Sequence, residues 1–222
     1  MADGQDIRLR NPELLHLEDA NGNLSHGFNQ EWFGSEWQRR AGCGPCVAAN
    51  LLLYLHRTRR LELPFALDSR ADLLAFMEAV WVHVTPTAMG LHTLKRFCGG
   101  VHAFLHAHAV PLDCRTFGVA RRRGARPPFE ALAGFIAEGL RSDSPVAFLN
   151  LSNGTVRNLE PWHWVTLVAV GDGPSADAFP AEIYDGEQAI GMDLRQWYDT
   201  TTLGGGFLYL AGGSGKPGCT AG

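Results

Sequence analysis

Residues 42–46 restrict what this chain can fold into more than any other stretch, because two glycines flank a thiol there and a proline follows. The sequence reads Gly-Cys-Gly-Pro-Cys, and an apolar run rich in Ala and Leu continues it to residue 55. Glycine permits tight turns and close backbone approach. Pro45 suits a first helical turn because its missing N–H has no helical partner there. The pattern predicts a turn that opens directly into an apolar helix over residues 43–56.

Two thiols lie at the start of this expected helix, Cys43 in its first turn and Cys46 one turn later. The N–H groups of a first helical turn have no helical partner, and the helix dipole is positive at that end. Both effects favour a thiolate over a thiol, and the thiolate is the reactive form of cysteine. Because both effects act on the two thiols almost equally, the residues alone leave two candidate nucleophiles.

The overall composition is that of a globular protein. A length of 222 residues fits one large domain, and 45% hydrophobic residues suffice for a real core. The net charge of −4 gives no indication of a nucleic-acid partner. No apolar run reaches the roughly 18 residues that suggest a membrane span, so we expect no membrane partner.

The cysteines and the first residues bear on the expected compartment. Five cysteines at irregular spacing do not resemble a disulfide framework. Residues 1–6 are polar and acidic, without the basic and apolar regions of a secretory signal. We therefore expect a soluble, cytoplasmic protein with free thiols.

Helical patterns come first along the chain and strand patterns second. The expected helices cover residues 43–56, 68–84, 91–108, 128–139 and 194–198, and the expected strands cover 145–151, 162–170, 181–184 and 206–210. Residues 29–41 contain three large aromatic side chains among polar ones, so we expect a loop held over the core. This order favours an α+β fold over alternating α/β.

The same patterns suggest one domain with two parts. We expect residues 1–28 to be an N-terminal extension that is mostly loop, and residues 29–212 to form a single catalytic domain. Within it, residues 29–142 are expected to be mainly helical and residues 143–212 mainly sheet. The Gly- and Pro-containing end at 213–222 is expected to be a flexible tail.

Three residues could form one catalytic constellation. Cys43 lies at a helix start, His163 opens a buried strand, and Asp185 closes a neighbouring strand before a glycine. If the two strands are adjacent and antiparallel, His163 and Asp185 lie at the same sheet edge. An imidazole beside a thiol takes its proton, and a carboxylate on the other ring nitrogen fixes the tautomer and orientation. Acyl transfer needs this order of nucleophile, base and orienting group.

At this point the sequence resembles papain-like cysteine peptidases, and it is most similar to the bacterial branch related to peptidases that process bacteriocin leaders. That branch has a glutamine in the N-terminal segment, a Gly-Cys-Gly-Pro turn, a histidine in an apolar strand, and an Asp or Asn on the next strand. Residues 42–45, His163 and Asp185 match these features, and the resemblance covers about residues 29–55 and 160–210. It implies a papain-like fold, in which a helical first half packs on a mostly antiparallel sheet.

The resemblance also implies roles for individual residues. In this branch the cysteine of Cys-Gly at the helix start is the nucleophile, which favours Cys43. In papain the second cysteine of a similar motif reacts, so Cys46 is the alternative nucleophile. The family has a glutamine side chain in the oxyanion hole beside the backbone N–H of the nucleophile, where such donors stabilise the developing charge. We favour Gln30 for this role and keep Gln38 as the alternative.

The expected function is hydrolysis of a peptide or small amide by a Cys-His-Asp triad through an acyl-enzyme, with no cofactor or metal. One alternative is an acyltransferase of the same fold, similar to transglutaminases or phytochelatin synthase. Another is a catalytically idle module that binds a peptide in the cleft. The sequence leaves the substrate and the oligomeric state open.

A redox function is the third alternative, because Cys-Gly-Pro-Cys is also the dithiol motif of thioredoxins. In that fold a buried strand runs into the motif, and residues 36–40 do not have the pattern of such a strand. The proline after Thr85 lies at a suitable distance for the cis-proline of thioredoxins, but no apolar strand follows it. The context therefore favours the peptidase over the oxidoreductase.

A zinc site is a further, weaker hypothesis. Cys98, His102 and His106 would share one face of a helix, and His108 is near in sequence. The pair of glycines at 99–100 weakens that helix, and no second pair of ligands stands out. The basic residues 121–123 are expected to be a solvated loop.

Overall fold

Strand β5 (Val146–Asn150) shows why the centre of this molecule needs cover on both sides. All five of its residues are buried. Because successive side chains of a strand point to opposite faces, Ala147 and Leu149 join one hydrophobic cluster, and Val146 and Phe148 join another. A strand that is apolar on both faces requires packing partners on both.

The computed structural model describes residues 6–58, 60–171, 173 and 178–212. The tail expected at 213–222 lies outside these residues. Within them, a seven-stranded sheet has the order β4-β9-β5-β6-β7-β8, and β1 pairs with the end of β6. All these pairings are antiparallel. The other strands of this sheet are β1 (Ile7–Arg8), β4 (Leu112–Val119), β6 (His163–Val170), β7 (Pro180–Asp185), β8 (Gln188–Asp193) and β9 (Gly205–Gly212). A separate two-stranded sheet consists of β2 (Leu17–Glu18) and β3 (Leu24–Ser25).

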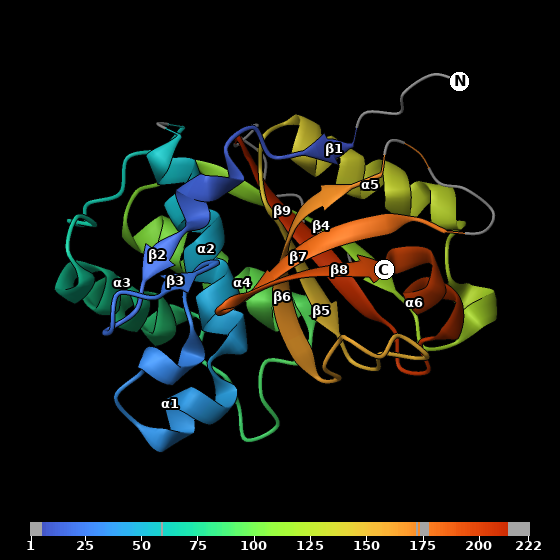
Figure 1. Ribbon diagram of the computed structural model, residues 1–222, viewed down its shortest axis with the longest axis horizontal. Coiled ribbons are helices and arrows are strands. Elements are labelled where there is room, and N and C mark those ends of the chain that lie inside the picture. The colour runs from blue at the N-terminus through green and yellow to red at the C-terminus, as the bar shows by residue number, and fades with distance from the viewer. Residues whose placement is uncertain (1–5, 59, 172, 174–177, 213–222) are drawn as a thin grey trace.

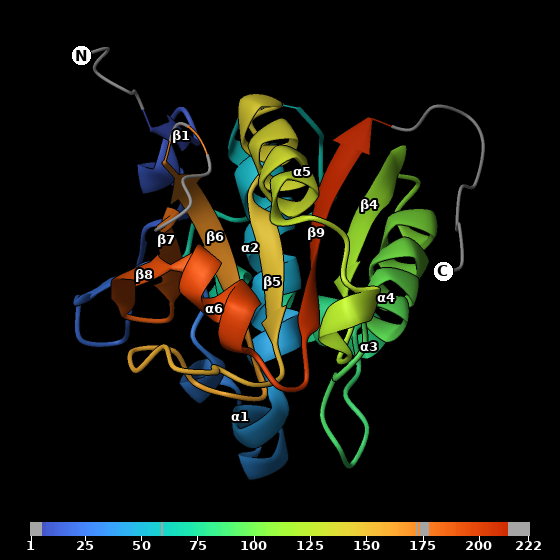
Figure 2. The same ribbon diagram turned by 90° about the vertical axis from the view of Figure 1, so that its right-hand side faces the viewer.

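Helices cover both faces of the sheet (Figures 1 and 2). On one face lie α2 (Cys43–Arg57), α3 (Arg70–His83) and α4 (Leu94–Ala107), and their apolar residues form one cluster with the sheet. On the other face lie α5 (Phe129–Arg141) and α6 (Leu194–Thr200), which share the second cluster. A short helix α1 (Glu36–Ala41) directly precedes α2. Three 3₁₀ turns complete the described elements: η1 Pro12–Leu15, η2 Gln30–Trp32 and η3 Arg123–Ala125.

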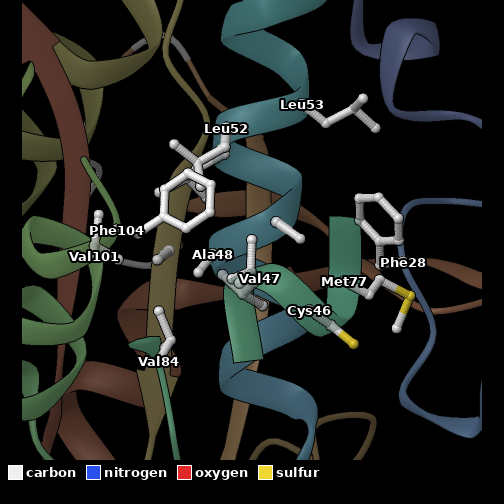
Figure 3. Close-up of a cluster of buried hydrophobic side chains, with 14 of the residues drawn as sticks. Phe28, Cys46, Val47, Ala48, Leu52, Leu53, Met77, Val84, Val101 and Phe104 are labelled. Atoms are coloured by element: carbon white, nitrogen blue, oxygen red, sulfur yellow. The ribbon is translucent and has the colours of Figure 1, made fainter. Parts of the chain in front are cut away.

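Helix α2 is the central helix of the fold. Every residue from Gly44 to Leu55 is buried, and a helix that is apolar nearly all round needs neighbours on all sides. Figure 3 shows Val47, Ala48 and Leu52 of this helix packed with Val101 and Phe104 of α4. The N-terminal end of α2 is therefore held rigidly between the sheet and the other helices.

The mixed α+β class with a mostly antiparallel sheet is confirmed. The five expected helices and four expected strands exist, with ends that shift by a few residues. The expected loop over 29–41 is wrong, because η2 and α1 form there. Helix α1 has a capping box, in which the side chains of Ser35 and Gln38 each bind the other residue's backbone N–H.

The sequence patterns also missed three strands of the large sheet, β1, β4 and β8. Strand β4 is an edge strand whose residues are mostly half-buried or exposed, and β8 is the opposite edge. Polar residues are tolerated at sheet edges, so neither segment has a clear apolar pattern. Segment 1–28, expected to be mostly loop, contains β1, β2 and β3.

Among the described residues, none of the helices combines the length and apolar character that crossing a membrane requires.

Candidate active site

Cys43 is the first residue of α2, and the glycines beside it let other segments come close. A Cβ at Gly42 would lie 2.8 Å from the ring of Phe33, and a Cβ at Gly44 would lie 2.7 Å from Cδ2 of Leu91. Both apolar side chains are buried against this turn. The two glycines thus allow the segment before the helix and the loop after α3 to close around Cys43, which stays partly exposed between them.

His163 and Asp185 meet because β6 and β7 pair antiparallel. Thr166 lies opposite Tyr184, so Asp185 comes next to the beginning of β6. Nε2–H of His163 donates to Oδ1 of Asp185 at 2.9 Å. The His163 side chain is only 12% exposed and that of Asp185 31%, so the pair is shielded from water but open on one side.

The other side of the imidazole ring faces Cys43. Burial lowers the pKa of His163, but hydrogen bonds to Asp185 and Cys43 and the negative charges of both groups raise it to about 10. Since Nε2 is occupied by Asp185, Nδ1 is the ring nitrogen left for the thiol. An imidazolium hydrogen-bonded to a thiol on one side and to a carboxylate on the other has the arrangement that nucleophilic cysteine chemistry uses. Cys43, His163 and Asp185 are therefore brought together as the sequence predicts.

Cys46, the alternative nucleophile, lies in a different environment. It is 4% exposed and belongs to the core cluster, where Figure 3 shows it with Phe28 and Met77. Burial raises the pKa of the Cys46 thiol well above its usual range, and the charges of Cys43 and Asp185 raise it further. A thiol that is held neutral in an apolar core is a packing residue.

The segment before α1 carries Gln30 to the same place. The β7–β8 hairpin turns at Gly186, whose carbonyl oxygen accepts hydrogen bonds from the backbone N–H of His26 at 2.7 Å and from the Ser25 hydroxyl at 3.1 Å. Asn29 then caps the short turn η2, where its side chain accepts from the N–H of Glu31. As a result Gln30 lines the same cleft as Cys43, His163 and Asp185.

Gln38, the alternative oxyanion donor, is engaged elsewhere. Its side-chain oxygen accepts from the backbone N–H of Ser35 at 3.2 Å in the capping box of α1. Its side-chain NH₂ donates to Glu78 of α3 at 2.6 Å. Gln38 does not line the cleft beside Cys43. Its role in the structure is to begin α1 and fix it to α3.

Asn50 links the Gln30 segment to strand β6, which carries His163. It is 3% exposed, its side-chain oxygen accepts from the N–H of Phe28 at 2.9 Å, and its NH₂ donates to Oγ1 of Thr166 at 3.0 Å. Buried amides of this kind must satisfy their donors and acceptors internally. Sequence reasoning missed Asn50, although a lone polar residue inside an apolar helix is the signal that could have found it.

Cys43 lies where two depressions meet. The larger one has a volume of about 1070 Å³ and contains polar and charged side chains, among them Glu31, Arg157 and Glu187. The smaller one has a volume of about 410 Å³ and is mostly apolar and aromatic. A substrate that spans both depressions would place a polar portion on one side of the thiol and an apolar portion on the other side.

Two tryptophans that flank His163 shape the apolar depression. Trp162 donates from Nε1 to the carbonyl oxygen of Met89 at 3.1 Å and stacks on His92 with ring centroids 5.8 Å apart. Trp164 donates to the carbonyl oxygen of Leu91. The loop between α3 and α4 is thus fastened to the strand that carries His163. Sequence reasoning missed this loop as a wall of the cleft.

The redox alternative lacks the context that it requires. Helix α1, rather than a strand, runs into the Cys-Gly-Pro-Cys segment. The described residues contain no cis peptide bond, so Thr85 does not precede a cis-proline.

A second cluster of sulfur and nitrogen atoms lies away from the cleft. Cys98 and His102 of α4 come together with Cys114 of β4, and their ligand atoms lie within 4.8 Å of one another. His106, one turn further along α4, is exposed and outside the cluster, and His108 packs against Phe104 instead. The structure therefore groups Cys98 and His102 with Cys114, and not with the expected His106 and His108. Cys114 was missed because its strand was missed.

Neither the models of protein families nor the functionally characterised proteins give a match to this chain.

Proposed function

We propose that this chain is a papain-like cysteine hydrolase that cleaves a peptide or small amide with Cys43, His163 and Asp185. The observation that carries the proposal is the position of the His163 ring, which is hydrogen-bonded to Asp185 on one side and to Cys43 on the other. The opening of α2 at a Gly-Cys-Gly-Pro turn and its packing against an antiparallel sheet support the papain-like assignment.

In the first half of the reaction, the Cys43 thiolate attacks the carbonyl carbon of the amide. The tetrahedral oxyanion would be stabilised by the backbone N–H of Cys43 and the side-chain NH₂ of Gln30. The His163 imidazolium then gives its proton to the leaving amine, and a thioester remains on Cys43. Asp185 keeps the ring oriented and stabilises its positive charge throughout.

In the second half, water attacks the thioester. Neutral His163 removes a proton from this water, the tetrahedral intermediate collapses, and the Cys43 thiolate leaves as the carboxylic acid product forms. An amine in place of water would give acyl transfer by the same steps. The raised pKa of His163 restores the imidazolium for the next cycle.

The cleft suggests which substrates fit. Trp37, Met89 and Trp162 line the apolar depression next to Cys43, and these residues are 45%, 61% and 45% exposed. Exposed large apolar side chains that gather in one place mark a binding surface. We therefore propose that the substrate places a bulky apolar or aromatic group there and a polar portion in the larger depression.

The test uses electrophilic peptides that trap a cysteine nucleophile, such as peptidyl vinyl sulfones with different side chains. We expect one covalent adduct per chain, located on Cys43 by mass spectrometry, and faster reaction with aromatic than with acidic side chains. Cys43→Ala should abolish the adduct, and Cys46→Ala should retain it. Labelling at the slow rate of a small free thiol, without preference among the peptides, would remove the hydrolase proposal and leave an idle binding module.

A further inference from the structure

The second sulfur cluster connects helix α4 to the edge strand β4. Cys98 is buried, whereas Cys114 and His102 are half-buried. The two sulfur atoms lie within 4.8 Å of each other, and the Cys114 thiol points to the carbonyl oxygen of Cys98 at 3.9 Å. Two thiols from consecutive elements of the chain, helix α4 and strand β4, therefore face each other across one packing contact.

The hydrogen bonds of His102 determine its tautomer. The backbone N–H of Cys114 can only donate, and it points to Nε2 of His102 at 3.2 Å, so Nε2 is the unprotonated nitrogen. In the neutral ring the proton is then on Nδ1, which lies 4.0 Å from the sulfur of Cys98. Nδ1–H is thus directed at Cys98 and favours its thiolate.

This tautomer is the wrong one for a metal ion inside the cluster. A metal held by both sulfurs and by Nδ1 would need the lone pair on Nδ1 and the proton on Nε2. That proton would face the N–H of Cys114, so two donors would oppose each other where a metal-bound histidine normally has an acceptor. The hydrogen bonds therefore fit thiol chemistry better than coordination.

We propose that Cys98 and Cys114 are a redox-sensitive pair that forms a reversible disulfide with a low-molecular-weight disulfide as the oxidant. The Cys114 thiolate, which is the more exposed, attacks one sulfur of the oxidant; the second sulfur leaves as a thiolate that takes up a proton. The Cys98 thiolate, supported by His102, then attacks the sulfur of Cys114 and expels the first half of the oxidant as a second thiol. Two protein thiols are oxidised and one external disulfide is reduced to two thiols.

The new bond would fasten α4 to β4. Helix α4 begins at Leu94, and the residues just before it, Leu91 and His92, line the apolar depression beside Cys43. A disulfide between residues 98 and 114 closes a short loop and restricts the unfolded chain. Oxidation should therefore stabilise the half of the protein that carries this wall.

The experiment incubates the full chain in a glutathione buffer poised at about −200 mV. The chain carries Cys43→Ser and Cys219→Ser, which remove the nucleophile and a thiol outside the described residues. Mass spectrometry of an unreduced digest should find a peptide pair joined through Cys98 and Cys114 that disappears with dithiothreitol. The melting temperature should rise by about 5 °C or more on oxidation. Cys46, the matched buried cysteine, should stay reduced.

Variants separate the role of His102 from simple proximity. His102→Gln should still form the disulfide but several times more slowly, and the difference should shrink at high pH, where Cys98 is deprotonated without help. Cys114→Ser should lose both the bridged peptide and the rise in melting temperature. Two results overturn the proposal: the absence of the bridged peptide in the Cys43→Ser, Cys219→Ser chain, or one tightly held zinc ion that is lost in the His102→Gln variant and protects both thiols.

Discussion

Nε2 of His163 and Oδ1 of Asp185 are 2.9 Å apart, at the end of two paired strands and beside the first residue of the central helix. This contact holds the imidazole so that its other nitrogen faces the thiol of Cys43. It joins the sheet and the helical half of the molecule at one point.

The two thiols of residues 43–46 should differ sharply in reactivity. At about pH 6 ordinary thiols are protonated, whereas a thiolate paired with imidazolium reacts. Iodoacetamide should therefore label Cys43 quickly at this pH and leave Cys46 untouched, because Cys46 is buried and its pKa is raised. Cys43→Ala should abolish the rapid labelling, while Cys46→Ala should keep it in a folded protein. The opposite pattern would assign the nucleophile to Cys46.

Activity should fall at high pH as His163 loses its proton. The pKa of His163 is raised to about 10, so the imidazolium that protonates the leaving amine is present below this pH and lost above it. We expect the alkaline limb of kcat/KM near pH 10. Asp185→Asn removes a negative charge with little change in shape, and it should move this limb to lower pH and reduce kcat. An alkaline limb that does not move in Asp185→Asn would mean that Asp185 does not control the protonation of His163.

Replacing Gln30 should lower kcat much more than replacing Gln38. Gln30 lines the cleft with Cys43, so Gln30→Ala should lower kcat by about 10²–10³-fold with a smaller change in KM. Gln38→Ala should leave kcat nearly unchanged and cost about 1 kcal/mol of stability, because it removes part of the cap of α1. Steady-state kinetics and urea unfolding measure the two effects. Equal kinetic losses in both variants would argue against a specific oxyanion donor.

Loss of Asn50 should loosen the Gln30 segment and the protein as a whole. Asn50→Ala leaves the N–H of Phe28 and the hydroxyl of Thr166 without their buried partner, which should cost about 2 kcal/mol or more. Asn158→Ala is the matched control, since Asn158 makes an exposed hydrogen bond to Gly191 and its loss should cost about 0.5 kcal/mol. Urea denaturation gives both values. Similar costs would show that the buried link is not special.

The close approach at Gly44 can be tested by a double substitution. Gly44→Ala alone should destabilise the protein, because the new Cβ would lie 2.7 Å from Leu91. In a Leu91→Ala background the same change should destabilise the protein less, because only the Cβ of residue 91 remains close, at 3.3 Å, and alanine is the better helix former. Melting curves of the unchanged protein, the two single variants and the double variant isolate the contribution of the contact between residues 44 and 91. A loss of equal size in both backgrounds would place the strain elsewhere.

The sequence by itself determined the elements whose signals are local. The Gly-Pro turn into an apolar run predicts α2 because glycine, proline and alanine act on the backbone next to them. The apolar run over 162–170 likewise predicts β6. Edge strands such as β4 have no such signal, since half of their surface tolerates polar residues.

Only the tertiary structure decided what lies next to each candidate residue. Gln30 and Gln38 are both candidates in the sequence, which favours Gln30. In the structure, hydrogen bonds from the N-terminal segment to Gly186 bring Gln30 into the cleft, and the capping box of α1 engages Gln38. Cys43 and Cys46 share a helix turn, yet one faces His163 and the other faces the core. Cys114 meets Cys98 because β4 pairs with β9 at the sheet edge beside α4. Register and packing across the sheet set these distances, and neither is a property of neighbouring residues.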